Sequence, residues 1–307
     1  MGKLLQGVTS GIVKQSPFRV VLYGPGGVGK TTWASNAPNP IFCAEHGGTE
    51  ELDVKRMPFT RTWDEILGGV QELIHDPHDY QTFVLDTADW LEPIIWRSIC
   101  DRDKKSNIED YGYGKGYKIA IDEWRYLFSK LEDLQDRRGM HVIILGHREI
   151  KTFQNPIGDP YDRFEMKLSK DAKGLLMEWS KAMLFANFET FTRKKSQSDR
   201  KAMAFGEGSR VVYTQPRPQW DAKTRYTLPE KLPLSWSEFE RAARSRVAAA
   251  PEDVRDQIKT LLEDADDVTR TQAAASLERC GGDSGKLVLL RDWLRCKVQP
   301  KSETAAE

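Results

Sequence analysis

The sequence predicts an α/β fold, with a mainly parallel sheet, helices on both faces, and a small C-terminal helical segment. In the first two-thirds of the 307 residues, short apolar runs alternate with stretches that repeat apolar residues every three or four positions. Near-continuous apolar strands of this kind are typical of parallel strands buried on both faces. The expected strands are 18–23, 41–44, 82–85, 141–145 and 182–186, and the clearest expected helices are 63–75 and 117–137.

The pattern changes twice after residue 186. Residues 201–205 and 210–214 flank Gly206-Glu207-Gly208, and this spacing predicts a β-hairpin. Beyond Pro251 the pattern predicts short helices. These helices are expected at 252–263, 267–279 and 285–296. We therefore expect a core over residues 1–246, a helical appendage over 247–298 and a disordered tail over 299–307.

Composition excludes several classes of protein. Hydrophobic residues make up 39% of the chain and charged residues 30%, as expected for a compact soluble protein. No apolar run approaches the ~18 residues needed to cross a bilayer, so no membrane association is expected. The four cysteines lie far apart without a Cys-x-x-Cys pair, which argues against zinc or a disulfide framework and fits a reducing cytoplasm.

Charge is balanced overall but uneven along the chain. There are 46 basic and 46 acidic side chains in total. Residues 147–246 carry 20 basic and 13 acidic side chains, a net of +7. A basic segment within a neutral protein is a modest indication of a polyanionic partner, either phosphate or nucleic acid.

The strongest motif is a phosphate-binding loop between the first strand and a helical segment. It reads Gly24-Pro25-Gly26-Gly27-Val28-Gly29-Lys30-Thr31, followed by Thr32, and fits Gly-x-x-x-x-Gly-Lys-Ser/Thr. In such a loop the backbone N–H groups surround the β-phosphate, the lysine contacts the β- and γ-phosphates, and the hydroxyl ligates Mg²⁺. The sequence therefore predicts that residues 24–32 bind ATP with Mg²⁺.

Polar residues at three further strand ends complete the predicted site. Asp86 is expected to hold Mg²⁺ with Thr31. The next residue is Thr87 rather than Glu, so we expect Glu45 to activate the attacking water, with a turn-capping surface role as the alternative. His147 is expected to sense the γ-phosphate, although a structural histidine is equally open. The carboxyl ends of parallel strands share one edge, where these residues should meet.

These motifs resemble the RecA-like branch of P-loop ATPases. The match is closest to a phage-encoded RecA-like family that includes Sak-type single-strand annealing proteins. It covers about residues 10–245 and rests on the phosphate loop, 42–45, 84–86, 111–117, 146–147 and 222–229. The resemblance implies an ATPase of phage recombination, in the bacterial host cytoplasm, that binds single-stranded DNA and promotes annealing. It also implies a homo-oligomer, either a ring or a short filament, with nucleotide at the subunit interface. The C-terminal helical segment is not covered by the resemblance. For that segment, binding a single-strand-binding protein, mediating assembly and packing against the core all stay open.

Two segments are candidates for binding DNA. Tyr111, Tyr113, Lys115 and Tyr117 lie among glycines and combine aromatic faces with a cation, which suits stacking on unpaired bases. A glycine-rich helix entry with inward-packed aromatics is the alternative. The resemblance implies a second DNA-contacting mobile loop within 149–173, whose basic residues are Lys151, Arg163, Lys167, Lys170 and Lys173.

Lys223 and Arg225 form a candidate interface pair. They lie two apart on an expected strand, so both should point to one face. The resemblance implies that such a pair reaches the γ-phosphate of a neighbouring subunit and stabilises transition-state charge. The alternative is two solvated cations on a strand.

Other functions stay open at this point. A RecA-like helicase or helicase-accessory ATPase of phage replication would share every nucleotide-site residue. A P-loop kinase or a nucleotide-gated interaction protein would not act on DNA at all. A GTPase is disfavoured because the sequence has no Asn-Lys-x-Asp motif.

Overall fold

The computed structural model describes residues 16–189, 191–193, 203–205, 208–248, 251–263 and 265–280, together with residues 287, 290, 291, 293, 294 and 297. The chain forms two compact units that divide between Ala243 and Arg244. The first unit contains the sheet and the phosphate loop. The second contains C-terminal helices.

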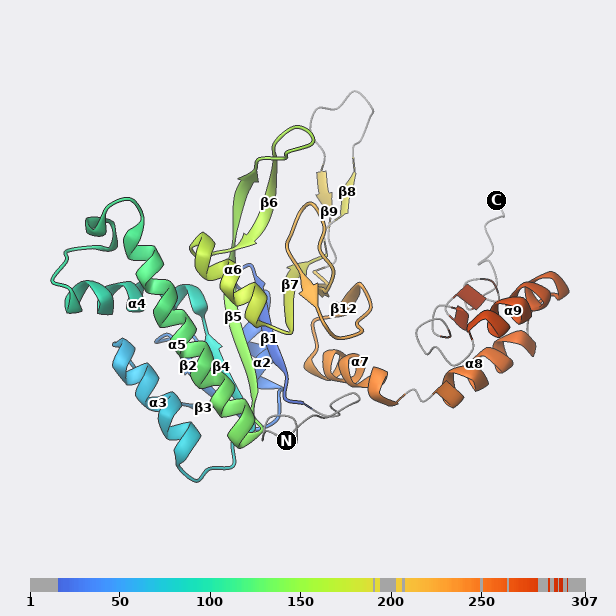
Figure 1. The fold of residues 1–307 in the computed structure, drawn as a ribbon, viewed down its shortest axis with the longest axis horizontal. Coiled ribbons are helices and arrows are strands. Elements are labelled where there is room, and N and C mark those ends of the chain that lie inside the picture. Colours follow the sequence, from blue (N-terminus) through green and yellow to red (C-terminus); the bar gives the residue numbers. More distant parts are fainter. Residues whose placement is uncertain are drawn as a thin grey trace, which may run out of the picture. The chain divides into compact units, whose positions relative to one another are not determined.

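A mainly parallel sheet organises the first unit (Figure 1). Its strands run in the order β12-β10-β7-β1-β5-β4-β2-β3, with β6 paired to β5 and β11 to β7. The six strands from β7 to β3 are parallel, as predicted. Their bounds are β1 (Arg19–Gly24), β2 (Pro40–Ala44), β3 (Lys55–Arg56), β4 (Thr82–Asp86), β5 (His141–Phe153), β6 (Tyr161–Met166), β7 (Ala182–Phe188), β10 (Arg210–Tyr213), β11 (Lys223–Thr224) and β12 (Lys231–Pro233).

Helices cover both faces of this sheet, which confirms the predicted fold class. Successive side chains of a strand point to opposite faces, so Val20 and Leu22 pack on one side and Val21 and Tyr23 on the other. The first side is covered by α2 (Lys30–Ser35) and α7 (Trp236–Ala248). The second is covered by α3 (Trp63–His75), α4 (Ala88–Arg102), α5 (Lys115–Arg138) and α6 (Lys170–Trp179).

Local sequence explains where the long helices begin. Helix α3 occupies the predicted residues because Thr62 and Glu65 form a reciprocal capping box at its start. Helix α5 begins at Lys115, two residues before the predicted start. At Gly116 the chain lies so close to the carbonyl oxygen of Ile108 that a Cβ atom would be 2.3 Å from it. The glycine-rich stretch is therefore a helix entry that follows the short 3-10 helix η1 (Ile108–Tyr111).

The predicted hairpin of residues 201–205 and 210–214 is wrong. Strand β9 (Met203–Phe205) pairs instead with β8 (Phe191–Arg193), and β10 pairs with β7 and β12. Val212 on β10 is 2% exposed and packs with Leu184 and Leu232. Because β10 buries this side chain in the core, it extends the main sheet rather than folding back on β9.

The segment 149–173, expected to contain a mobile DNA-contacting loop, is largely a β-hairpin followed by the start of a helix. Its mobility and its contact with DNA stay predictions. Strand β5 continues to Phe153 and pairs antiparallel with β6, and α6 begins at Lys170. Phe153 and Tyr161 face each other across the hairpin with ring centroids 5.4 Å apart, and Arg163 lies over the Phe153 ring. Figure 1 shows this hairpin projecting from the sheet.

The second unit contains α8 (Pro251–Glu263) and α9 (Asp267–Cys280), which confirms the first two predicted C-terminal helices. They share an apolar cluster that includes Ile258, Ala273 and Leu294. Most of the predicted helix at 285–296, and the whole predicted tail at 299–307, lie outside the described residues. None of the helices that could be searched is long and apolar enough to span a bilayer.

Candidate functional site

The phosphate loop has the predicted strand–loop–helix context. Strand β1 ends at Gly24, and α2 begins at Lys30. A Cβ atom on Gly24 would lie 2.3 Å from the carbonyl oxygen of Ala186, so only glycine fits there. Gly27 and Gly29 have φ angles of 73° and 103°, in the left-handed region that favours glycine. Three glycines of the motif are therefore required by the backbone path alone.

Lys30 places a buried positive charge inside this loop. Its side chain is folded over the loop, where Nζ donates to the carbonyl oxygens of Gly24 (3.3 Å) and Pro25 (3.0 Å). The residue is 6% exposed. Burial lowers the pKa of Lys30, while the nearby carboxylates of Asp86 and Asp89 oppose that shift. The loop thus holds a desolvated cation where the motif predicts phosphate.

Thr31 and Asp86 meet beside the lysine, as predicted. The Thr31 hydroxyl donates to Asp86 Oδ2 at 2.7 Å. Asp86 is buried, and burial raises its pKa against the opposing effects of Thr31 and Lys30. In the part of the chain that could be searched, no three His, Cys, Asp or Glu side chains form a metal cluster by themselves. A hydroxyl and a carboxylate fit Mg²⁺, which takes few protein ligands and completes its shell with phosphate and water.

The site contains a carboxylate that the sequence analysis missed. Asp89, in the first turn of α4, accepts hydrogen bonds from the backbone N–H and from Nδ1 of His147, both at 2.9 Å. Burial raises the pKa of Asp89, but the hydrogen bonds from His147 outweigh it and hold the value at about 2. The signal was a second aspartate three residues after Asp86, at the start of a helix.

His147 lies at the predicted sheet edge. It is paired with Gly24 in the register between β5 and β1, so it sits directly beside the start of the phosphate loop. Its side chain is 40% exposed, whereas that of Asp89 is 10% exposed. The Asp89 carboxylate therefore orients a partly accessible imidazole next to the loop.

Glu45 reaches the same edge from β2. Its backbone N–H donates to the carbonyl oxygen of Asp86 at 3.0 Å, which places it beside the end of β4. The residue is exposed. The structure brings Glu45 next to Asp86 through the backbone, and its role as a base stays a prediction.

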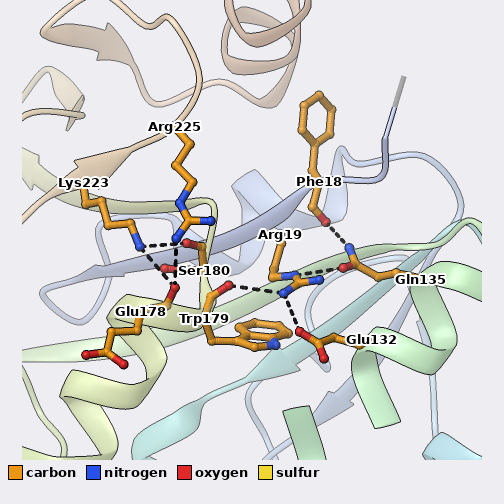
Figure 2. Close-up of polar contacts among 9 residues, drawn as sticks. All are labelled: Phe18, Arg19, Glu132, Gln135, Glu178, Trp179, Ser180, Lys223 and Arg225. Carbon is orange, nitrogen blue, oxygen red and sulfur yellow. Dashed lines mark hydrogen bonds and ion pairs between the residues drawn. The ribbon is translucent and has the colours of Figure 1, made fainter. Parts of the chain in front are cut away.

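Lys223 and Arg225 lie at the amino-terminal end of the parallel strands, opposite to the end that carries the phosphate loop. Strand β11 pairs with the first residues of β7, and Figure 2 shows both side chains directed at carbonyl groups where α6 ends. Lys223 Nζ donates to the carbonyl oxygens of Met177, Glu178 (3.3 Å) and Ser180 (3.0 Å), and Arg225 to that of Glu178 (3.5 Å). Neither residue is near the phosphate loop of its own chain. A role at a neighbour's site stays a prediction.

The three tyrosines of 111–117 differ in accessibility. Tyr111 donates to Asp103 Oδ2 (2.7 Å), and Tyr117 donates to Glu109 and packs edge-on against Trp96. Tyr113 makes no such contact with the residues that the structure describes, and it is wholly exposed. Of the three, Tyr113 is the one whose ring is open for stacking, and the exposed Lys115 follows it closely.

The basic residues expected to contact DNA also differ. Arg163 is 11% exposed and pairs with Asp221. Lys151 pairs with Glu149 at 2.8 Å but is about half exposed. Lys167 and Lys170 are exposed, whereas Lys173 pairs with Glu165. Lys151, Lys167 and Lys170 are thus the accessible cations around the β5–β6 hairpin.

Comparison with known proteins gives a family match and structural similarity to solved proteins. A model of the AAA domain matches residues 16–226, well over half of the chain. The crystal structure of the RadB recombinase is similar at 13% identity and a TM-score of 0.37, over 64% of this chain and 80% of that chain. At that TM-score the similarity carries no argument about activity. No curated protein matches the chain.

Proposed function

The chain belongs to the AAA domain family, and we propose that it is an ATP-hydrolysing recombination protein of a phage, which binds single-stranded DNA and promotes annealing. One observation supports the ATPase half above all. The predicted metal residues Thr31 and Asp86 are hydrogen-bonded to each other beside the buried ammonium of Lys30. Lys30 and Thr31 begin α2 and Asp86 ends β4, and together these three groups match what Mg·ATP needs.

Each group has a defined part in the proposed reaction. Lys30 and the loop N–H groups bind the phosphates, and Thr31 with Asp86 would hold Mg²⁺. When bound, Mg²⁺ would neutralise charge on the β- and γ-phosphates. Glu45 accepts a proton from the attacking water. His147, held by Asp89, donates to the phosphate end of the site and responds to its occupancy.

The DNA half of the proposal is supported by the continuity of β5. The same strand carries His147 beside the phosphate loop and then continues into the projecting β5–β6 hairpin. Lys151 on this hairpin, with Lys167 and Lys170 just beyond it, offers accessible positive charge. Nucleotide state could therefore change DNA affinity through a single strand. Tyr113 and Lys115 supply a stacking face and a further cation.

Fluorescence anisotropy of a labelled single-stranded oligonucleotide tests the proposal. Binding is measured without nucleotide, with ADP and with a non-hydrolysable ATP analogue, at two salt concentrations. We expect the analogue to tighten binding and higher salt to weaken it. The Glu45→Gln chain should bind DNA with ATP as wild type does with the analogue, because it retains ATP without hydrolysing it.

Two outcomes would contradict parts of this proposal. Protein that binds ATP but no oligonucleotide in any nucleotide state would remove the DNA half and leave an ATPase with another partner. Nucleotide-dependent DNA binding without acceleration of strand annealing in a quenching assay would remove the annealing activity alone.

A further inference from the structure

Arg210 lies at the nucleotide edge of the sheet although it follows the phosphate loop by about 180 residues. It is the first residue of β10, which runs antiparallel to β7, and it is paired with Phe188 at the carboxyl end of β7. Gly24 contacts Ala186, two residues earlier on the same strand. The fold therefore brings Arg210 to the same side of the molecule as the phosphate loop.

The side chain of Arg210 lies directly over this loop. A Cβ atom on Gly29 would be 3.0 Å from Arg210 Nη1 and 3.5 Å from Leu234 Cδ2. Leu234 is held there because its backbone N–H donates to the carbonyl oxygen of Arg210 at 3.0 Å. The φ angle of 103° favours glycine at position 29, and the short distance shows how closely the guanidinium approaches the loop.

This guanidinium is an accessible positive charge. Arg210 is exposed. In the described ranges, no Asp or Glu lies within 4.0 Å of it, whereas Arg217 and Lys231 nearby are paired with Glu230 and Glu189. An unneutralised arginine next to a loop that binds phosphates is suited to hydrogen-bonding a phosphate oxygen.

The sheet order indicates which end of the nucleotide Arg210 faces. Asp86 on β4 and His147 on β5 lie on one side of β1, and β7 with β10 lie on the other. Thr31 and Asp86 would hold Mg²⁺, which would neutralise charge on the β- and γ-phosphates, so that end of the nucleotide would lie toward Asp86. The nucleoside end would then lie toward β10.

We propose that Arg210 binds the nucleotide from within its own chain, at the α-phosphate end, as a cationic side wall of the phosphate loop. The proposal rests on the nucleotide-binding half of the proposed function. Because ADP and ATP share the α-phosphate, Arg210 contributes to the affinity of both. It does not report the γ-phosphate.

Titration of the full-length chain with fluorescent ADP and with a fluorescent non-hydrolysable ATP analogue tests the assignment. Arg210→Gln should raise both dissociation constants by about tenfold, in line with the loss of a charge-assisted hydrogen bond. Arg210→Lys should have a smaller effect, because it keeps the charge but loses the planar fork. Arg217→Gln, which removes a paired arginine of the same region, should change neither constant.

The outcomes distinguish a failure of the Arg210 assignment from a failure of the proposed function. Arg210→Gln chains that bind both nucleotides as wild type does, or that lose only the ATP analogue, would overturn the assignment of Arg210 and leave the proposed function intact. Wild-type protein that binds neither nucleotide would overturn both. Thermal unfolding of the variants without nucleotide should match wild type, since the exposed guanidinium has no ion-pair partner within the described ranges.

Discussion

At the scale of single residues, the site is a set of buried or half-buried charges that neutralise one another. Lys30, Asp86 and Asp89 share one small volume, and each affects the protonation of another. Asp89 has two hydrogen bonds from His147, which makes it the anchor of the imidazole beside the loop. A carboxylate with a depressed pKa stabilises the folded state at neutral pH.

We predict that Asp89→Asn lowers the free energy of unfolding by about 1–3 kcal/mol at pH 7, because the charge-assisted bonds to His147 are lost. The folded pKa of about 2 lies below the unfolded value of about 3.9. The contribution is therefore complete above pH 4 and is lost as pH falls toward 2. Urea unfolding of both chains at pH 7 and pH 3 measures it.

The matched control is Asp64→Asn, which also changes an aspartate in the first turn of a helix but at an exposed position. Asp64→Asn should change the free energy of unfolding little at either pH. An Asp89→Asn deficit as large at pH 3 as at pH 7 would show that the ionised carboxylate is not what stabilises the fold.

At the scale of elements, α4 and α6 connect the carboxyl ends of the parallel strands, where the phosphate loop lies, to their amino-terminal ends. Helix α4 carries Asp89 at its start and Glu92 one turn later. The buried Glu92 carboxylate accepts from the hydroxyl (2.6 Å) and the backbone N–H (3.0 Å) of Ser169, the residue before α6. The far end of α6 receives Lys223 and Arg225. A shift of α4 would therefore be transmitted to that pair.

We predict that Ser169→Ala destabilises the protein by about 1 kcal/mol at pH 8 and by less at pH 5. Burial raises the pKa of Glu92, and the Ser169 hydroxyl favours its ionised form. The hydroxyl is most needed when Glu92 is charged, so its contribution is present at high pH and declines as pH falls through the raised pKa. Chemical unfolding at the two pH values gives the difference.

Ser129→Ala provides the comparison, because that hydroxyl donates to the exposed backbone carbonyl of Tyr126 within α5. Its effect should be small and independent of pH. A Ser169→Ala effect that grows on acidification would rule out the proposed support of an ionised Glu92.

At the scale of the whole molecule, the residues of the predicted ATPase site are divided between the two ends of the parallel strands. The phosphate loop is at one end, and Lys223 with Arg225 is at the other, in the same compact unit. Within one subunit of this structure they lie at opposite ends of the parallel strands. A head-to-tail homo-oligomer would place the second end of one subunit against the first end of the next.

We predict that Lys30→Ala and Arg225→Ala chains, each deficient in ATP hydrolysis alone, recover activity when mixed. The intact phosphate loop of the Arg225→Ala chain would receive Arg225 from its Lys30→Ala neighbour. Phosphate release from equimolar mixtures measures the recovery. Mixing Arg225→Ala with the Lys30→Ala/Arg225→Ala double variant is the control and should give none.

A different result would contradict the prediction that Arg225 acts at the nucleotide site of a neighbouring subunit. Arg225→Ala chains that hydrolyse ATP as fast as wild type would assign Arg225 only to the carbonyl groups of α6. Nucleotide binding by Arg225→Ala should be unchanged in either case.

Features encoded by neighbouring residues were determined by the sequence alone. The phosphate loop, the parallel strands and the ends of α3 follow from local patterns: glycines with positive φ, apolar runs, and a capping box at Thr62 and Glu65. The residues Thr31 and Asp86 could be paired in advance because parallel strand ends share one edge. Local chemistry and a single topological rule were sufficient for this part of the site.

The tertiary structure decided which distant segments meet. The contact between Asp89 and His147, the position of Arg210 over Gly29, and the pairing of β10 with β7 join residues far apart in the chain. The sequence near 201–214 fits a local hairpin, but burial of Val212 in the core outweighs that local preference. Such pairings depend on which apolar faces pack together, and the free energy of that packing belongs to the whole fold rather than to any one segment.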